Sequence, residues 1–177
     1  WRAETNRGAL ALLRVPLASF SDGRDSAPDS AYTALPGVEG YALQSRYVGA
    51  YLLYGGGAGW YRPQSMNSRL YAVRYAQGQD VYALPLVHGV DRIEALGGDA
   101  LVAGSDGKDL HLTTLRLSGL PVTMDRYTRA GAAQGETRSH GFFYKPEGSD
   151  GGLLGLPIIG GDQSSRARRF CFSTTGG

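Results

Sequence analysis

The chain has 177 residues, the length of one domain, and a domain of that size buries about 70% of the surface of its unfolded chain. Its 18 basic and 16 acidic residues are scattered and give a formal net charge of +2, so charge gives no reason to expect a nucleic-acid partner. No stretch reaches the ~20 apolar residues of a membrane-spanning helix, so no membrane-spanning segment is expected.

Period-two alternation and bounded apolar runs recur along the whole chain, whereas helical spacing is almost absent. Gly, Asp, Asn and Pro separate nearly all of these runs, and Gly97-Gly98-Asp99 has the residue types of a hairpin turn. The sequence therefore predicts an all-β fold. In chain order, strands are expected at residues 9–17, 47–55, 69–76, 80–87, 91–96, 99–105, 110–117, 122–128, 139–145, 153–159 and 169–174.

Four of these strands share a position after a turn and often carry proline or arginine near their end. They begin near residues 9, 69, 110 and 153, at separations of 60, 41 and 43 residues. The last two separations match a β-propeller blade, and a polar surface loop at 19–37 lengthens the first. The sequence predicts about four blades' worth of strands, and an irregular β-sandwich is the alternative. The expected repeat units are 1–38, 39–89, 90–130 and 131–177.

The beginning of the chain aligns with a later segment. "WRAETNRGALALLRVP" matches "YKPEGSDGGLLGLP", which places Trp1 opposite Tyr144 and Pro16 opposite Pro157. Residue 1 is then expected near the end of a strand, and the chain is expected to be a fragment of a larger propeller. A closed propeller has four to eight blades, so the remaining blades or a partner chain would complete it.

The unit "SHGFFYKPEGSDGGLLGLPII" resembles the blade pattern of the secreted C-terminal β-propeller proteins that are distantly related to WD40 repeats. Residues 91–117 look like a second such blade, and the resemblance is clearest over residues 80–160. It implies a propeller fold and a secreted or cell-envelope location, and it implies little about activity. The matching positions are His140, Phe142, Phe143, Tyr144, Leu154, Leu156, Pro157 and Ile158.

The densest polar stretch is "QGETRSHG", in which Glu136, Arg138 and His140 alternate. On a strand these side chains share one face, where a carboxylate can orient a general base and an arginine can bind an anion. A salt-bridged row between blades has the same pattern and is the favoured interpretation. His88 and His111 are isolated in the sequence, and no histidine spacing indicates a zinc site.

The tripeptide Ser-Asp-Gly occurs at 21–23, 105–107 and 149–151. Each copy supplies too few carboxylates for a calcium loop, so turn chemistry is favoured over a Ca²⁺ site and no cofactor is expected. The single cysteine, Cys171, alternates with two phenylalanines and is expected to be a small residue on one face of a strand.

Eight of the eleven tyrosines fall between residues 41 and 82. Trp60 and Tyr61 follow a glycine-rich stretch at Gly55–Gly57, which is expected to be a flexible turn that places them at a loop tip. With Arg62 they are the first candidates for binding a protein or a carbohydrate. Packing of aromatic rings between blades explains the same composition equally well.

These features favour a non-enzymatic binding or scaffolding propeller that uses loops at one end, with residues 55–67 and 19–37 as the candidate loops. One alternative is a propeller hydrolase or lyase whose site is assembled from several blades and includes Glu136, Arg138 and His140. Another is a structural subunit whose open blade edges pair with a further chain.

Overall fold

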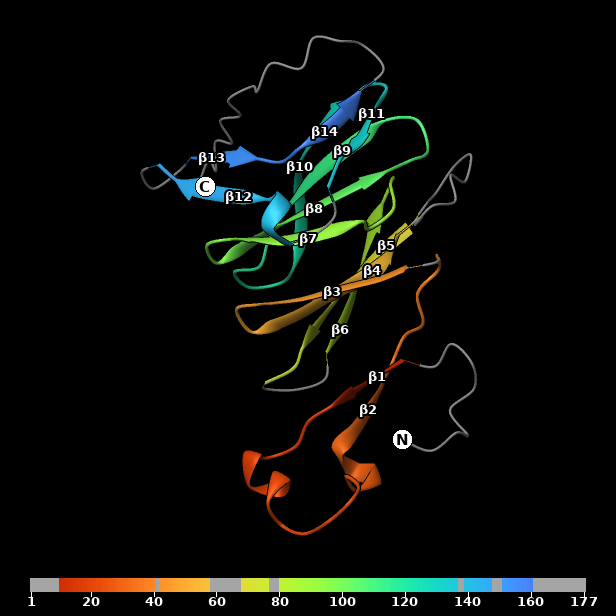
Figure 1. The fold of residues 1–177 in the computed structure, drawn as a ribbon, viewed down its shortest axis with the longest axis vertical. Helices are drawn as coiled ribbons and strands as arrows, with labels where there is room; N and C mark the ends of the chain where they lie inside the picture. The colour runs from red at the N-terminus through yellow and green to blue at the C-terminus, as the bar shows by residue number, and fades with distance from the viewer. Residues whose placement is uncertain are drawn as a thin grey trace. The chain divides into compact units, whose positions relative to one another are not determined.

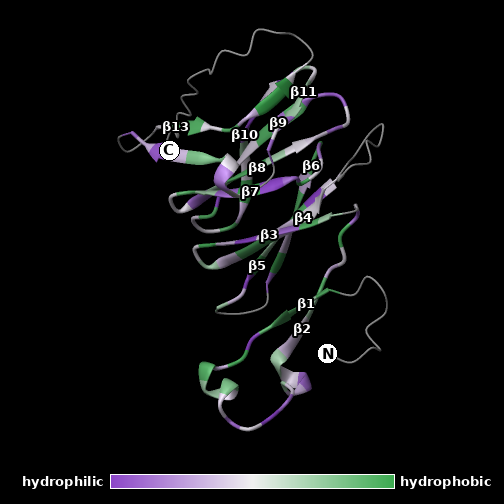
Figure 2. Cartoon of the chain, viewed as in Figure 1, coloured by the Kyte–Doolittle hydropathy of each residue, from purple (hydrophilic) through white to green (hydrophobic). Residues whose placement is uncertain are grey.

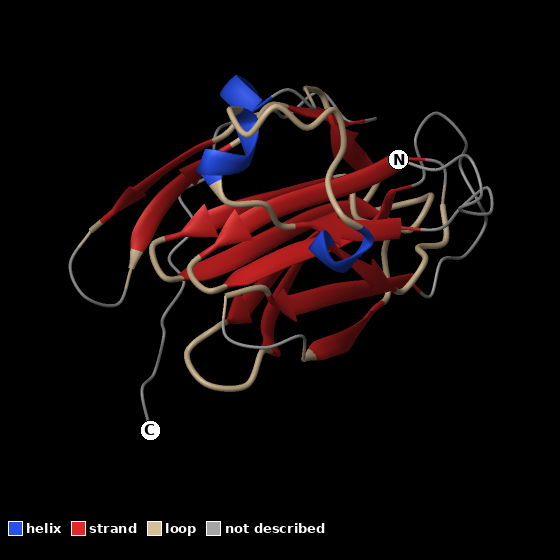
Figure 3. Cartoon of the chain, turned by 90° about the horizontal axis from the view of Figure 1, so that it is seen from below, coloured by secondary structure: helices blue, strands red, loops and turns tan. Residues whose placement is uncertain are grey.

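The computed structural model describes residues 10–40, 42–57, 68–76, 80–136, 139–147 and 151–160. Within these ranges the chain consists of antiparallel β-strands and three short 3₁₀ helices, η1 to η3, and it contains no α-helix (Figures 1 and 3). The predicted all-β class is confirmed for this part of the molecule. No helix within it is long and apolar enough to cross a membrane. The chain divides into two compact units, Trp1–Val38 and Glu39–Gly177.

The first unit contains one two-stranded sheet, in which β1 (Leu10–Leu13) pairs antiparallel with β2 (Tyr32–Leu35). Two 3₁₀ helices, η1 (Leu17–Phe20) and η2 (Asp29–Ala31), lie between these strands in the sequence. The segment 19–37 was expected to be a surface loop, but it includes β2 and η2. The strand was missed because the segment is mostly polar, although the aromatic and β-branched side chains of Tyr32 and Thr33 favour a strand.

The second unit begins with a four-stranded sheet in which each strand pairs with the next. The single strand predicted at 47–55 is instead the hairpin of the first two strands, since the chain reverses at Gly49, whose φ is +56°. The hairpin was not predicted because its turn lies within an apolar run of the sequence. The strands are β3 (Ala42–Val48), β4 (Tyr51–Gly57), β5 (Ser68–Arg74) and β6 (Val81–Leu86).

A second four-stranded sheet follows with the same strand order along the chain. The predicted hairpin turn is confirmed at Gly97-Gly98, where Gly97 has a φ of +67° and Leu96 pairs with Asp99. The last strand has an irregular register between Thr123 and Arg126. The strands are β7 (Arg92–Leu96), β8 (Asp99–Ser105), β9 (Leu110–Arg116) and β10 (Val122–Arg129).

Four shorter strands complete the described part of this unit. β11 (Ala132–Gln134) pairs with β14 (Ile158–Gly160), and β12 (Phe143–Pro146) pairs with β13 (Gly152–Gly155). The strand expected at 153–159 is divided in two because Pro157, which lacks an N–H group, lies between β13 and β14. The strand expected at 169–174, with Cys171, lies outside the described residues.

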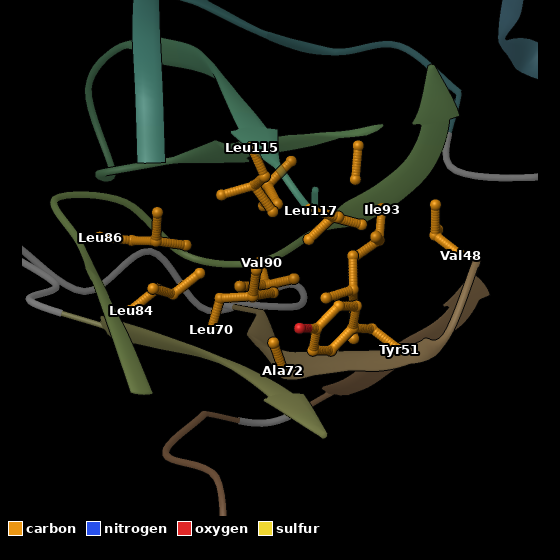
Figure 4. Close-up of a cluster of buried hydrophobic side chains, with 13 residues drawn as sticks. Val48, Tyr51, Leu70, Ala72, Leu84, Leu86, Val90, Ile93, Leu115 and Leu117 are labelled. Atoms are coloured by element: carbon orange, nitrogen blue, oxygen red, sulfur yellow. The ribbon is translucent and has the colours of Figure 1, made fainter. Parts of the chain in front are cut away.

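The core of the second unit lies between its two four-stranded sheets (Figure 4). Buried side chains of β4 to β6 face those of β7 to β9, and each buried leucine, isoleucine or valine among them contributes roughly 1.5–3 kcal/mol. The residues of this cluster are Val48, Tyr51, Leu53, Leu70, Ala72, Leu84, Leu86, Val90, Ile93, Ala100, Val102, Leu115 and Leu117.

The opposite face of the β7–β10 sheet is also covered. Leu101, Ala103 and Leu112 form a second buried cluster with Leu154 of β13. A strand that is buried on both faces reads as a continuous apolar run, which explains the pattern "ALVAG" in β8. The first strands of the two sheets, β3 and β7, lie against each other and carry hydrophilic stretches (Figure 2).

Candidate functional site

The connections between strands gather at two ends of the paired sheets, because successive strands run in opposite directions. We call one of them the loop end: it consists of Gly57 and Ser68, which flank the β4–β5 connection, together with residues 87–91 and 106–109. The opposite end, the turn end, carries the β3–β4, β7–β8 and β9–β10 connections. At the turn end the Tyr51 hydroxyl donates to the carbonyl of Gly119 at 2.8 Å and joins the two sheets.

Backbone hydrogen bonds attach residues 89–91 to both sheets. The N–H of Val90 donates to the carbonyl of Gly56 in the first sheet at 2.9 Å. The N–H of Gly89 donates to Ser105 in the second sheet at 2.9 Å. The Ser68 hydroxyl, at the start of β5, donates to the carbonyl of His88. The loop end is therefore fixed at the boundary between the sheets.

Glycines permit this close approach. A Cβ on Gly57 would lie 2.6 Å from the carbonyl oxygen of Val90, and one on Gly104 would overlap with the carbonyl oxygen of Gly89. The prediction of a flexible turn at Gly55–Gly57 is wrong, because these residues form the buried end of β4. They are glycines because Val90 and the backbone of Glu39 lie directly against them and leave no room for a Cβ.

Two histidines lie together behind the loop end. The rings of His88 and His111 stack with centroids 5.3 Å apart and an interplanar angle of 10°. His88 Nδ1 lies 2.7 Å from the carbonyl oxygen of Gly89, and its Nε2 lies 2.8 Å from the Thr113 hydroxyl. The two histidines are isolated in the sequence, and the packing of the β6–β7 connection against β9 brings their rings together.

His111 is held by two further partners. Its Nε2 lies 2.9 Å from Asp106 Oδ2, and its Nδ1 lies 3.0 Å from the hydroxyl of Thr128 on β10. All four ring nitrogens of the pair therefore have a hydrogen-bond partner within the protein. We call His88, His111, Asp106, Thr113 and Thr128 the histidine cluster. In this arrangement its bonds join the loop end to β9 and β10.

Burial decides the charge of His88. Its side chain is fully buried, and desolvation lowers its pKa from 6.5 to about 4, an effect that the hydrogen bond to Gly89 opposes and the charge of Arg126 reinforces. At neutral pH the ring is uncharged. Nδ1–H then donates to the Gly89 carbonyl, and Nε2 accepts from Thr113.

The second Ser-Asp-Gly copy forms a turn, as predicted. Gly107 has a φ of +95°, and Asp106 Oδ1 accepts from the N–H groups of Lys108 and Asp109. Burial would raise the pKa of Asp106, but these bonds and the one from His111 hold it well below its ordinary range. In the part of the chain that the structure describes, no group of three or more His, Cys, Asp or Glu side chains could hold a metal ion.

A row of polar side chains crosses the first strands of the sheets, and we call it the ion-pair row. Glu94 of β7 contacts Arg46 of β3 at 2.6 Å and Arg92 of its own strand at 2.8 Å. Arg92 also donates through Nε to Gln134 of β11 at 2.9 Å and through Nη2 to the carbonyl of Glu136 at 2.7 Å. The Arg92 and Glu94 side chains are only 3% and 6% exposed.

The sequence favoured such a row at Glu136, Arg138 and His140. Glu136 follows β11, and its side chain packs against Gly141, whereas His140 is exposed in η3 (Ser139–Gly141). The two do not alternate on one strand, and Arg138 lies outside the described residues. The pattern that does form a row is "RIEAL", in which Arg92 and Glu94 share a face because they are two positions apart on a strand.

The aromatic candidates divide into two groups. Trp60, Tyr61 and Arg62 lie outside the described residues. Six tyrosines of the same region form ring pairs, and all six lie on or beside the strands of the first four-stranded sheet. The pairs are Tyr54–Tyr71 at 5.1 Å, Tyr47–Tyr75 at 5.0 Å and Tyr51–Tyr82 at 6.3 Å between ring centroids.

Comparison with known proteins finds no matching family model. It also finds no significant match among curated proteins or among solved structures.

Proposed function

We propose that this chain is part of a β-propeller of a secreted or cell-envelope protein, and that it binds a protein or a carbohydrate through its loop end without catalysing a reaction. Two successive four-stranded sheets, β3–β6 and β7–β10, support the propeller, since they pack face to face with their first strands adjacent. Each lies within one of the expected repeat units, 39–89 and 90–130. The resemblance to the C-terminal propellers related to WD40 repeats supports the same proposal.

One observation carries the binding role: segment 88–91 is hydrogen-bonded to both sheets at the loop end. Binding residues are commonly placed on loops that a well-packed scaffold positions. A loop whose attachment points are already ordered loses less conformational entropy on binding. The loop end meets this requirement through backbone bonds, through the Ser68 hydroxyl and through the histidine cluster.

The β4–β5 connection supplies the binding residues in this proposal. It leaves the first sheet at Gly57 and re-enters at Ser68, and both flanks lie against residues 88–91. Its sequence includes Trp60, Tyr61 and Arg62. Tryptophan, tyrosine and arginine are the residues most enriched among the dominant contacts of protein interfaces.

Tryptophan fluorescence tests the proposal directly, because the chain has only two tryptophans. In a Trp1→Phe background, Trp60 is the single reporter. We expect its emission to shift when one member of a panel of purified oligosaccharides or immobilised peptides binds, and binding to fall at least tenfold in Tyr61→Ala and Arg62→Ala.

Leu120→Ala is the matched control, since Leu120 is 67% exposed in the β9–β10 connection at the turn end. Its binding should equal that of the parent protein. If ligands found with the panel bound the Tyr61 and Arg62 variants as tightly as the parent, the loop end would not be the binding surface.

A second role, as a subunit that pairs with further strands, is favoured by β14. Its residues Ile158 and Ile159 are 39% and 64% exposed, and its sheet with β11 has only two strands among the described residues. Further blades or a partner chain would cover such an edge. Native mass spectrometry tests this role: Ile159→Lys should reduce a dimeric or higher species if the edge is an assembly surface, and a purely monomeric parent protein would exclude self-assembly.

A further inference from the structure

The histidine cluster connects titratable side chains to the backbone of the loop end. His88 is itself the first residue of segment 88–91, and its carbonyl accepts from Ser68 at the start of β5. Its ring contacts Thr113 and stacks on His111, both on β9. Through its carbonyl and its ring, His88 therefore joins the β4–β5 flank, the β6–β7 connection and the second sheet.

Protonation of His88 conflicts with these contacts. The neutral ring uses Nε2 as an acceptor for the Thr113 hydroxyl, whereas the charged ring has a donor at that position. The hydroxyl must then turn its hydrogen elsewhere, within a site where the ring is fully buried. Neither hydrogen-bond partner of His88 is a carboxylate, so a positive charge gains no direct ion pair there.

The surrounding charges do not remove the conflict. Arg126 of β10 and the ring of His111 both disfavour a positive charge on His88. Asp106 favours it, but this carboxylate already accepts from His111 and from two backbone N–H groups of its own turn. Asp91, in the same segment as His88, accepts from the N–H of Ser105 at 3.1 Å.

We propose that His88 is an acid-sensitive switch, whose protonation detaches segment 88–91 from the two sheets and opens the loop end. The segment is held by hydrogen bonds to Gly56, Ser105, Ala103 and Ser68 and by the buried side chain of Val90, so its release withdraws Val90 from the core while the strands stay paired. The flanks of the β4–β5 connection then lose their neighbour. The switch depends on the histidine cluster alone and operates whether or not the loop end binds a ligand.

Hydrogen–deuterium exchange of the free protein at pH 7.0 and pH 4.5 tests the switch, with labelling times corrected for intrinsic exchange. In the parent protein we expect the protection of amides 89–91 to fall on the order of 50-fold at pH 4.5. The amides of β8 and β9 away from the loop end should keep their protection. His88→Asn retains a side-chain N–H donor toward Gly89 and does not titrate, so its protection should not respond to acid.

His140→Asn is the control, because His140 is exposed in η3 and lies outside the cluster. It should respond to acid as the parent does. Equal protection at both pH values in the parent, an equal acid response in His88→Asn, or simultaneous opening of the whole sheet would each overturn the proposal.

A second measurement covers the case in which His88→Asn does not fold. The ¹³Cε1 shift of the His88 ring in the parent protein reports its protonation. The switch requires this shift to change over the same pH range as the loss of amide protection. Opening that occurs while the ring remains neutral would contradict it.

Discussion

His88 gives the molecule a stability that depends on pH in a defined direction. Its pKa is about 4 when folded and near 6.5 when unfolded, so the unfolded chain binds more protons between these values. The contribution is complete above pH 6.5 and is lost as the pH falls toward 4. Urea denaturation should show the free energy of unfolding falling by about 3 kcal/mol over this range. In His88→Asn this part of the fall should be absent, and a parallel fall would contradict the assignment.

Gly104 is a residue at which the fold tolerates no side chain. A Cβ there would overlap with the Gly89 carbonyl and lie 2.9 Å from His88 Nδ1. Gly104→Ala should lower the free energy of unfolding by more than about 3 kcal/mol, since backbone rather than a flexible side chain must move. Gly98→Ala is the matched control, because nothing lies within 4 Å of a Cβ at Gly98. Thermal unfolding of both variants measures the two losses of stability. Similar losses in the two variants would contradict the close approach of Gly89 to Gly104.

At the scale of elements, the ion-pair row connects β7 to β3 and to β11. Glu94→Gln leaves the buried Arg92 guanidinium without its carboxylate, and removing one partner of a buried pair costs about 3–5 kcal/mol. Arg46→Gln removes a side chain that is 41% exposed and should cost less than about 1 kcal/mol. Chemical denaturation of both variants measures the difference. A large loss in Arg46→Gln, or a small one in Glu94→Gln, would show that the row is solvated.

Strands were more predictable from the sequence than the connections between them. Alternation and turn residues identified β5 to β10, including the turn at Gly97-Gly98. The β3–β4 hairpin was missed because Gly49-Ala50 lies within an apolar run that reads as one strand. The histidine cluster was missed for a different reason: the approach of His88 to His111 depends on how a connection packs across a sheet, which local periodicity does not encode.

At the scale of the whole molecule, the repeat interval in the sequence predicted structurally similar units. It did not predict which faces of the sheets pack against each other. Apolar runs in β8 and β9 are consistent with a strand buried on both faces, and the structure covers one face with the first sheet and the other with β13. Of the candidate row Glu136, Arg138 and His140, the described members Glu136 and His140 do not share a strand, since His140 lies in η3. Two positions on a strand share a face wherever they occur, so the sequence alone could not distinguish that row from Arg92 and Glu94.

The proposed propeller and the position of the loop end both depend on the two four-stranded sheets packing face to face. Methyl–methyl nuclear Overhauser effects in a sample labelled at leucine and valine measure it directly. We expect cross-peaks between the methyl groups of Leu70 or Leu84 in the first sheet and those of Val102 or Leu115 in the second. Cross-peaks within each sheet but none between them would contradict the face-to-face packing.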